Sequence, residues 1–370
     1  MKKVLFITFL IAIRTIALCQ SSLASDPNWF IKPYANFAAI IQHRSSMGNL
    51  ITGYPKTYEL NIVKPTLGNK LWQIENNLPD IGLNLSFVDY ANPKELGYGI
   101  MVAPFVEIPL NKKQRTRRLY LRLCWGSAFM TKHFDLKENQ KNGAIGSMYN
   151  AYVQFKWFWH IPINKNVRFE PGFMFSHVSN GRAQSPNLGL NIFGVGAAFN
   201  FNITKKPTPS IEKIDSSTKS KSRHEFTVLN SYGVNDGEVH GKKYLTACMS
   251  FGYNYNKRNT HKFGLGFDVF YEQNYVKDLR ESNLPTDNAF QQLRYGPKIC
   301  YSYNIGCISL PLEMGAYINQ PITPDGSFYH KIGVRYMGKK GLMLGFGLRT
   351  HFAVAYCFDY GIGYRLPLGK

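Results

Sequence analysis

Residues 167–179 read VRFEPGFMFSHVS, and large apolar residues alternate there with polar or small ones. Successive side chains of a β-strand point to opposite faces, so the pattern predicts a strand with one apolar face. His177 and Ser179 continue that apolar face, whereas Arg168 and Glu170 belong to the other. Residues 190–201 repeat the alternation, with Asn191 on the same face as the phenylalanines that follow it. A turn centred near Gln184 would place Asn191 across from His177.

The same period of two runs through almost the whole chain. Aromatic residues make up 15% of the sequence, charged residues only 18%, and glycine occurs 32 times. One face of each predicted strand is large and apolar, and the opposite face carries charges and glycines. That polarity, apolar outside and polar inside, is typical of transmembrane β-barrels. The predicted strands run about 10 to 14 residues, the length needed to cross a bilayer at a tilt.

Strand candidates fall into two groups of about eight, one in residues 28–203 and one in 224–368. Residues 205–223 separate them and are rich in Lys, Ser, Thr and Pro, which indicates a linker. We therefore expect an all-β, antiparallel transmembrane barrel protein of about 16 strands. Two tandem eight-stranded barrels and one large barrel both fit the pattern, although glycine-rich inner faces suit narrow barrels. The expected regions are 25–204 and 224–370.

The N-terminus carries the features of an export signal. Met1, Lys2 and Lys3 precede an apolar run, residues 4–13, that is too short to span a bilayer as a helix. We expect a signal peptide over 1–24, cleaved after Cys19 or Ala24. The formal net charge of +21 could attract nucleic acid, but in an exported protein anionic lipid head groups are the better partner. The cysteines show no CxxC spacing, so no zinc site is expected, and no cofactor is implied.

Long predicted loops near residues 43–55, 134–147, 179–189 and 273–290 alternate with short turns. In bacterial barrels the long loops face outward. His177 and Ser179 would then sit at the outer end of their strand, on the lipid-facing wall. Such a placement suits an ester substrate that arrives from within the membrane.

The sequence His177-x-Ser179-Asn180, followed by Pro186-Asn187-x-Gly189 and then Asn191, resembles the motif of the outer-membrane lipid A 3-O-deacylases (PagL), relatives of the acyloxyacyl hydrolases. The resemblance is close over residues 177–191 and looser over 26–204, and the C-terminal half lies outside it. It implies an eight-stranded barrel with the catalytic residues on its last two strands. It also implies 3-O-deacylation of lipopolysaccharide at the Gram-negative outer membrane.

Carried over by position, the resemblance makes Ser179 the nucleophile, His177 the base and Asn180 an oxyanion residue, with Asn187 another polar position of the motif. The family's third residue is a glutamate, and here it is Asn191. An amide oxygen can accept a hydrogen bond from the imidazole and orient it, but it lacks the charge that stabilises imidazolium. We therefore expect a serine-type ester hydrolase in which Asn191 is the orienting residue.

Two further expectations concern partners and alternatives. Lys132, in the loop beyond residues 119–129, is a candidate ligand for a lipid A phosphate. The sequence leaves open whether the chain forms a homodimer. The alternative function is a non-enzymatic outer-membrane barrel, a pore or structural module that keeps the motif without its activity.

Overall fold

The computed structural model describes residues 28–111, 118–204 and 223–369, except 238, 240 and 353. The expected signal peptide (1–24) and nearly all of the expected linker (205–223) lie outside the described residues. In the described part of the chain no helix combines the length and the apolarity needed to cross a membrane.

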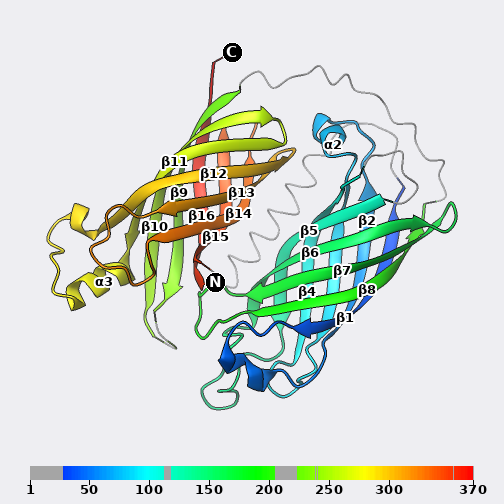
Figure 1. Ribbon diagram of the computed structural model, residues 1–370, viewed down its shortest axis with the longest axis horizontal. Coiled ribbons are helices and arrows are strands. Elements are labelled where there is room, and N and C mark those ends of the chain that lie inside the picture. Colours follow the sequence, from blue (N-terminus) through cyan, green and yellow to red (C-terminus); the bar gives the residue numbers. More distant parts are fainter. Residues whose placement is uncertain are drawn as a thin grey trace. The chain divides into compact units, whose positions relative to one another are not determined.

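Two closed antiparallel barrels make up the fold, each of eight strands (Figure 1). The first is built from β1 (Phe30–Ile40), β2 (Lys56–Pro65), β3 (Asp80–Asp89), β4 (Tyr98–Pro109), β5 (Arg118–Met130), β6 (Tyr149–Pro162), β7 (Val167–Ser179) and β8 (Leu190–Asn202). The second is built from β9 (His224–Asp236), β10 (Lys243–Arg258), β11 (His261–Glu272), β12 (Leu293–Ile305), β13 (Ile308–Ala316), β14 (Phe328–Met337), β15 (Leu342–His351) and β16 (Val354–Leu368). The prediction of 16 strands in two groups of eight is confirmed, and of the two closures that the sequence left open, the chain adopts the tandem one.

In the described part of the chain, four short helices lie in three of the connections between strands. They are η1 (Ser45–Leu50), α2 (Leu71–Glu75), α3 (Gln273–Glu281) and η2 (Ala289–Gln292). Long connections follow β1, β5, β7 and β11, as the loop pattern predicted, and the connection from β2 to β3 that holds α2 is also long.

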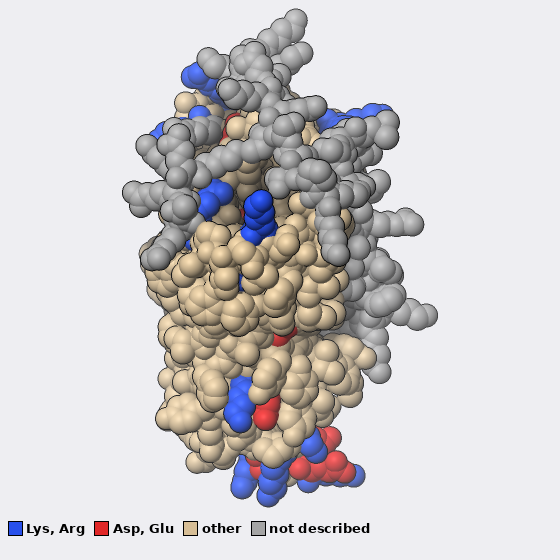
Figure 2. All heavy atoms as spheres, turned by 90° about the vertical axis from the view of Figure 1, so that its right-hand side faces the viewer, with Lys and Arg blue, Asp and Glu red and all other residues tan. Residues whose placement is uncertain are grey.

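The outward faces of the strands are apolar and exposed. On β8, Phe193, Val195 and Phe199 expose 45%, 59% and 47% of their surface. In water the exposure of such a continuous apolar surface would be energetically unfavourable. In a bilayer the same surface contacts the acyl chains of the lipids. Figure 2 shows one side of the molecule, where uncharged residues cover most of the described surface and charged side chains lie mainly towards its upper and lower ends. The predicted polarity, apolar outside and polar inside, is confirmed.

The interior of the first barrel is filled by buried ion pairs. Lys32 Nζ lies 2.8 Å from a Glu107 oxygen and 2.6 Å from a Glu170 oxygen. Lys156 Nζ lies 2.7 Å from Glu59, and Arg122 bonds both Glu59 and Glu107. All of these side chains are at most 1% exposed, so each charge depends on its partners for the stabilisation that water would otherwise give.

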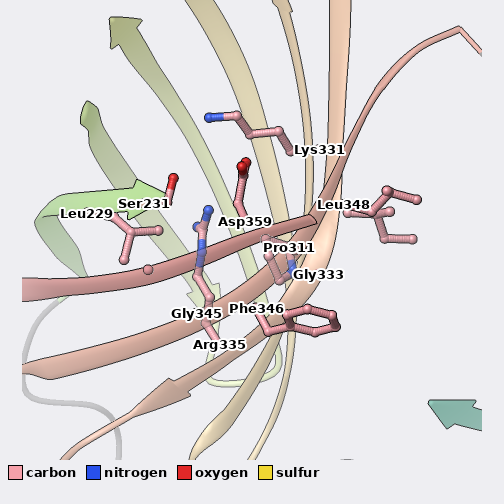
Figure 3. A pocket seen from close by; sticks show the side chains of 13 residues that line it. Leu229, Ser231, Pro311, Lys331, Gly333, Arg335, Gly345, Phe346, Leu348 and Asp359 are labelled. Carbon is pink, nitrogen blue, oxygen red and sulfur yellow. The ribbon is translucent and has the colours of Figure 1, made fainter. Parts of the chain in front are cut away.

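The second barrel has the same construction. Lys298 bridges Asp268 at 2.9 Å and Glu313 at 2.8 Å, and Arg349 bonds Glu272 at 2.6 Å. Near β14–β16 glycines replace larger side chains on the inner face and leave a small cavity with both apolar and charged residues in its lining. Figure 3 shows Ser231, Lys331, Arg335 and Asp359 converging on this cavity, with Phe346 and Leu348 on the other side of the wall.

Candidate active site at the end of β7 and β8

The antiparallel register of β7 and β8 brings together the residues of the motif. His177 pairs with Asn191 across the two strands, as the turn position predicted. On the other side of β7, His177 lies across from Val153 and Ser179 from Ala151, both on β6. Residues Phe169, Phe173 and Phe175 share the outward face of β7 with His177, so the site is the polar end of an apolar strip on the outer wall.

The three side chains form one hydrogen-bonded line. His177 Nε2 lies 2.9 Å from Ser179 Oγ, and His177 Nδ1 lies 2.6 Å from Asn191 Oδ1. An amide oxygen can only accept, so Nδ1 carries the proton of a neutral ring and Nε2 keeps its lone pair. The lone pair faces the serine hydroxyl. This is the tautomer that can take a proton from Ser179.

Gly189 makes room for the imidazole. Its φ is +79°, a left-handed conformation that disfavours other residues, and a Cβ built there would lie 2.6 Å from His177 Cε1. Any larger residue would push against the ring. Two constraints therefore favour glycine at position 189: the left-handed backbone of the turn and the close packing of His177.

Asn180 directly follows Ser179 in the chain, and it is bonded to Asn187. The backbone N–H of Asn180 donates to Asn187 Oδ1 at 3.0 Å, which fixes the orientation of the Asn187 amide. Asn187 Nδ2 is then left buried, without a hydrogen-bond partner in the described structure. The side chain of Asn180 instead donates to Ser147 Oγ at 3.0 Å. A buried donor without a partner is uncommon and marks a position where a ligand oxygen could bind.

Two loops meet over the site. The backbone N–H of Leu188 donates to Gly143 O at 3.2 Å, and that of Gly189 donates to Ala144 O at 2.9 Å. The Ser147 contact joins the same two loops. As a result Ser179 is only 3% exposed, although it lies on the outward face of its strand. His177 and Ser179 were expected to lie open on the lipid-facing wall. The structure adds that loop residues cover Ser179.

Lys132 and His43 complete the surroundings. Lys132 is exposed, lies in the loop after β5 beside Gly97, and is not in the hydrogen-bonded line. His43, in the loop after β1, was missed by the sequence analysis. Its Nδ1 lies 3.2 Å from Asn191 Nδ2 and its Nε2 lies 3.0 Å from Leu188 O. It continues the outward face of β1, but only closure of the barrel between β1 and β8 reveals its neighbour.

The second barrel has a different set of histidine contacts. His224, His261 and His351 bond the hydroxyls of Tyr253, Tyr301 and Tyr317 at 2.7, 2.9 and 2.9 Å. Within the described residues, no group of three or more His, Cys, Asp or Glu side chains is arranged to hold a metal ion. These three histidines bond tyrosine hydroxyls, whereas the hydrogen-bonded Ser179 and His177 lie on β7 of the first barrel.

Comparison with known proteins adds two family models and two distant structures. Residues 56–200 match the model of lipid A 3-O-deacylase (PagL), and residues 224–368 match that of the acyloxyacyl hydrolase C-terminal domain. No curated protein sequence matches the chain. A crystal structure of Neisserial surface protein A is similar at 12% identity and TM-score 0.31, covering 49% of this chain and 100% of that one. A mutant Rh. blastica porin is similar at 10% identity and TM-score 0.18, covering 91% of this chain and 100% of that one.

The two models follow the two barrels. The first matches from β2 to β8 and the second from β9 to β16. The expectation that the C-terminal half lies outside the resemblance is therefore wrong, because its own domain model covers it. Both matches together cover most of the sequence. The chain belongs to the lipid A 3-O-deacylase (PagL) family of outer-membrane hydrolases.

Proposed function

We propose that the first barrel removes an ester-linked acyl chain from lipid A by 3-O-deacylation, with Ser179 as the nucleophile. The observation that carries the proposal is the line from Ser179 Oγ through His177 to Asn191 Oδ1, with distances of 2.9 and 2.6 Å. A serine attacks an ester only when a base accepts its proton, and His177 Nε2 is in position to do so.

The steps follow from these positions. Ser179 Oγ attacks the ester carbonyl carbon as its proton passes to His177 Nε2. The tetrahedral intermediate then collapses, and His177 returns the proton to the oxygen of the departing sugar alcohol. The acyl chain stays on Ser179 as an ester. Water, deprotonated by His177, attacks that ester, and as the fatty acid is released His177 returns the proton to Ser179 Oγ.

Asn187 is the better oxyanion donor of the two asparagines. Its Nδ2 is buried without a partner in the described structure, on an amide that is bonded to the backbone of the residue after Ser179, whereas the Asn180 side chain is bonded to Ser147. We therefore assign the oxyanion contact to Asn187 and give Asn180 the task of orienting it through the backbone N–H. Donors placed where the negative charge develops are among the largest contributions to ester hydrolysis.

The location of the pair supports a lipid substrate. The acyl chains of lipid A lie in the outer leaflet, and the apolar strip on β7 and β8 leads along the barrel wall to His177 and Ser179. Lys132, exposed at the same end of the barrel, is the proposed contact for a lipid A phosphate. The buried ion pairs fill the described interior of the barrel, which disfavours the alternative of a pore.

Three other expectations stay predictions. They are the signal peptide over 1–24, the division into 25–204, 205–223 and 224–370, and a homodimer. N-terminal sequencing of the exported protein, proteolysis within 205–223 and chemical crosslinking in the membrane test them in turn.

Mass spectrometry of lipid A tests the proposed activity. Gram-negative cells that lack a 3-O-deacylase are compared with and without the full chain. Loss of one ester-linked acyl chain, abolished by Ser179→Ala at an equal amount of folded protein, is the expected result. Unchanged lipid A, or deacylation that survives Ser179→Ala, would overturn the proposal.

A further inference from the structure

The orienting residue Asn191 poses a problem that a carboxylate would not. Both oxygens of a carboxylate accept hydrogen bonds, so the group works in either orientation. An amide has one acceptor and one donor, and turned the other way it would present N–H groups to His177 Nδ1. The ring would then hold its proton on Nε2, facing Ser179, and could not act as a base. A site with asparagine at this position needs something that fixes the amide.

His43 has the contacts to fix it. Its Nε2 lies 3.0 Å from the carbonyl oxygen of Leu188, and a carbonyl oxygen only accepts, so Nε2 carries a proton. In the neutral ring Nδ1 is then an acceptor. Nδ1 lies 3.2 Å from Asn191 Nδ2, which can only donate. The Asn191 amide is thereby held with Nδ2 towards His43 and Oδ1 towards His177.

The other tautomer of His43 fits these neighbours poorly. With the proton on Nδ1, the ring could donate to Ile41 O at 3.3 Å. Its Nε2 lone pair would then face the oxygen of Leu188, and its Nδ1–H would face the N–H group of Asn191. Two good contacts would be exchanged for one longer contact. The position of Leu188 O thus selects the tautomer that holds Asn191.

The backbone supports this position from both sides. Ile41 N donates to Asn191 O at 2.8 Å, which extends the pairing of β1 and β8 up to the site. His43 follows Ile41 by two residues and so lies on the same outward face. The backbone N–H of Leu188 is itself bonded to Gly143 O, so the carbonyl that His43 meets belongs to an anchored loop.

We propose that His43 is a positioning residue that locks the Asn191 amide and thereby replaces the orientation-independent acceptor of a carboxylate. Ser179 and His177 would exchange the proton at Nε2, while Asn191 and His43 hold the ring by its Nδ1 side. The inference rests on the proposed function and deepens it. It predicts that His43 matters only as long as residue 191 is an amide.

A double-mutant comparison tests this dependence. The full chain and its variants are purified in detergent micelles and assayed with lipid A that carries a 3-O-linked acyl chain, to give kcat and KM. His43→Leu removes both ring nitrogen atoms, and His43→Gln keeps an acceptor for Asn191 and a donor for Leu188. Both are also made together with Asn191→Glu. His133→Leu, a histidine in the loop after β5, is the matched control.

We expect His43→Leu to lower kcat about tenfold or more, the effect of one lost hydrogen bond, with little change in KM. His43→Gln should recover most of that loss. In the Asn191→Glu background, His43→Leu should cost less than about threefold, because a carboxylate needs no lock. His133→Leu should leave kcat unchanged. If His43→Leu yields no folded barrel, His43→Phe carries the same comparison.

The outcomes separate the two proposals. An inactive parent chain, or activity that survives Ser179→Ala, overturns the proposed function itself. Activity that depends on Ser179, together with equal losses from His43→Leu in both backgrounds, overturns the lock and leaves the serine mechanism standing. Absence of any loss from His43→Leu does the same.

Discussion

Asn191 on β8 lies directly across from His177 on β7, and its Oδ1 is 2.6 Å from the imidazole Nδ1. The register of two strands thus orients the base, and none of the carboxylates in the described residues bonds its imidazole. The contact supplies orientation without negative charge. Its replacement is therefore the most informative single change in the proposed site.

Asn191→Glu should raise kcat at least tenfold. In a serine protease triad the reverse change, acid to amide, costs on the order of 10⁴ in rate, which sets the upper limit of the gain. Deacylation of lipid A by the purified chain measures it. Asn191→Leu, which removes the acceptor, should lower kcat, and it controls for the change in size. No gain from Asn191→Glu would assign the orienting role to another group.

Asn187→Leu should lower kcat by about 10² with little change in KM. Removal of one oxyanion donor has an effect of that size, because the contact strengthens as the charge forms. The matched change is Asn180→Ala, which removes the bond to Ser147 but leaves the backbone N–H that holds Asn187. We expect Asn180→Ala to cost less than Asn187→Leu, and the reverse order would return the oxyanion role to the Asn180 side chain.

Gly189→Ala should abolish most activity while the barrel still forms. The new Cβ would lie 2.6 Å from His177 Cε1 and would sit on a backbone with φ of +79°, so ring and loop must both shift. A displacement of a catalytic group by about 1 Å can lower the rate about 10²-fold. Gly143→Ala is the control, since its Cβ would meet only Leu188 Cδ1, at 3.9 Å. Equal activity of both variants would contradict this reading of the site.

The sequence predicted the strands, their faces and the cross-strand pair of the site. Period two determines which face a side chain occupies, and the turn between β7 and β8 determines the local register, so His177 and Asn191 could be matched without coordinates. Closure is different. Whether β8 returns to β1 or continues into a larger barrel depends on strand tilt and stagger around the whole sheet, which no local pattern carries. The contact between His43 and Asn191 depends on that closure and was therefore missed.

The covering of Ser179 was also beyond the sequence. Residues 134–147 and 179–189 were recognised as long loops, but loop conformation depends on which backbone groups find partners. The bonds from Leu188 and Gly189 to Gly143 and Ala144 tie these loops together, and no period or composition predicts them. The sequence therefore predicted which face of a strand each side chain occupies, but it did not predict the conformation of the loops or the contacts between them.

Glu59→Leu should lower the free energy of unfolding of the first barrel by about 3–5 kcal/mol. The change leaves Lys156 and Arg122 without a carboxylate that they now approach at 2.7 and 3.3 Å, and an uncompensated charge in a barrel interior is strongly unfavourable. Urea unfolding in detergent micelles, followed by tryptophan fluorescence, measures the loss. Lys137→Leu, at an exposed loop position, should stay within about 0.5 kcal/mol of the parent chain. If the paired changes Glu59→Leu and Lys156→Met together cost less than Glu59→Leu alone, the loss comes from the stranded lysine rather than from repacking around residue 59.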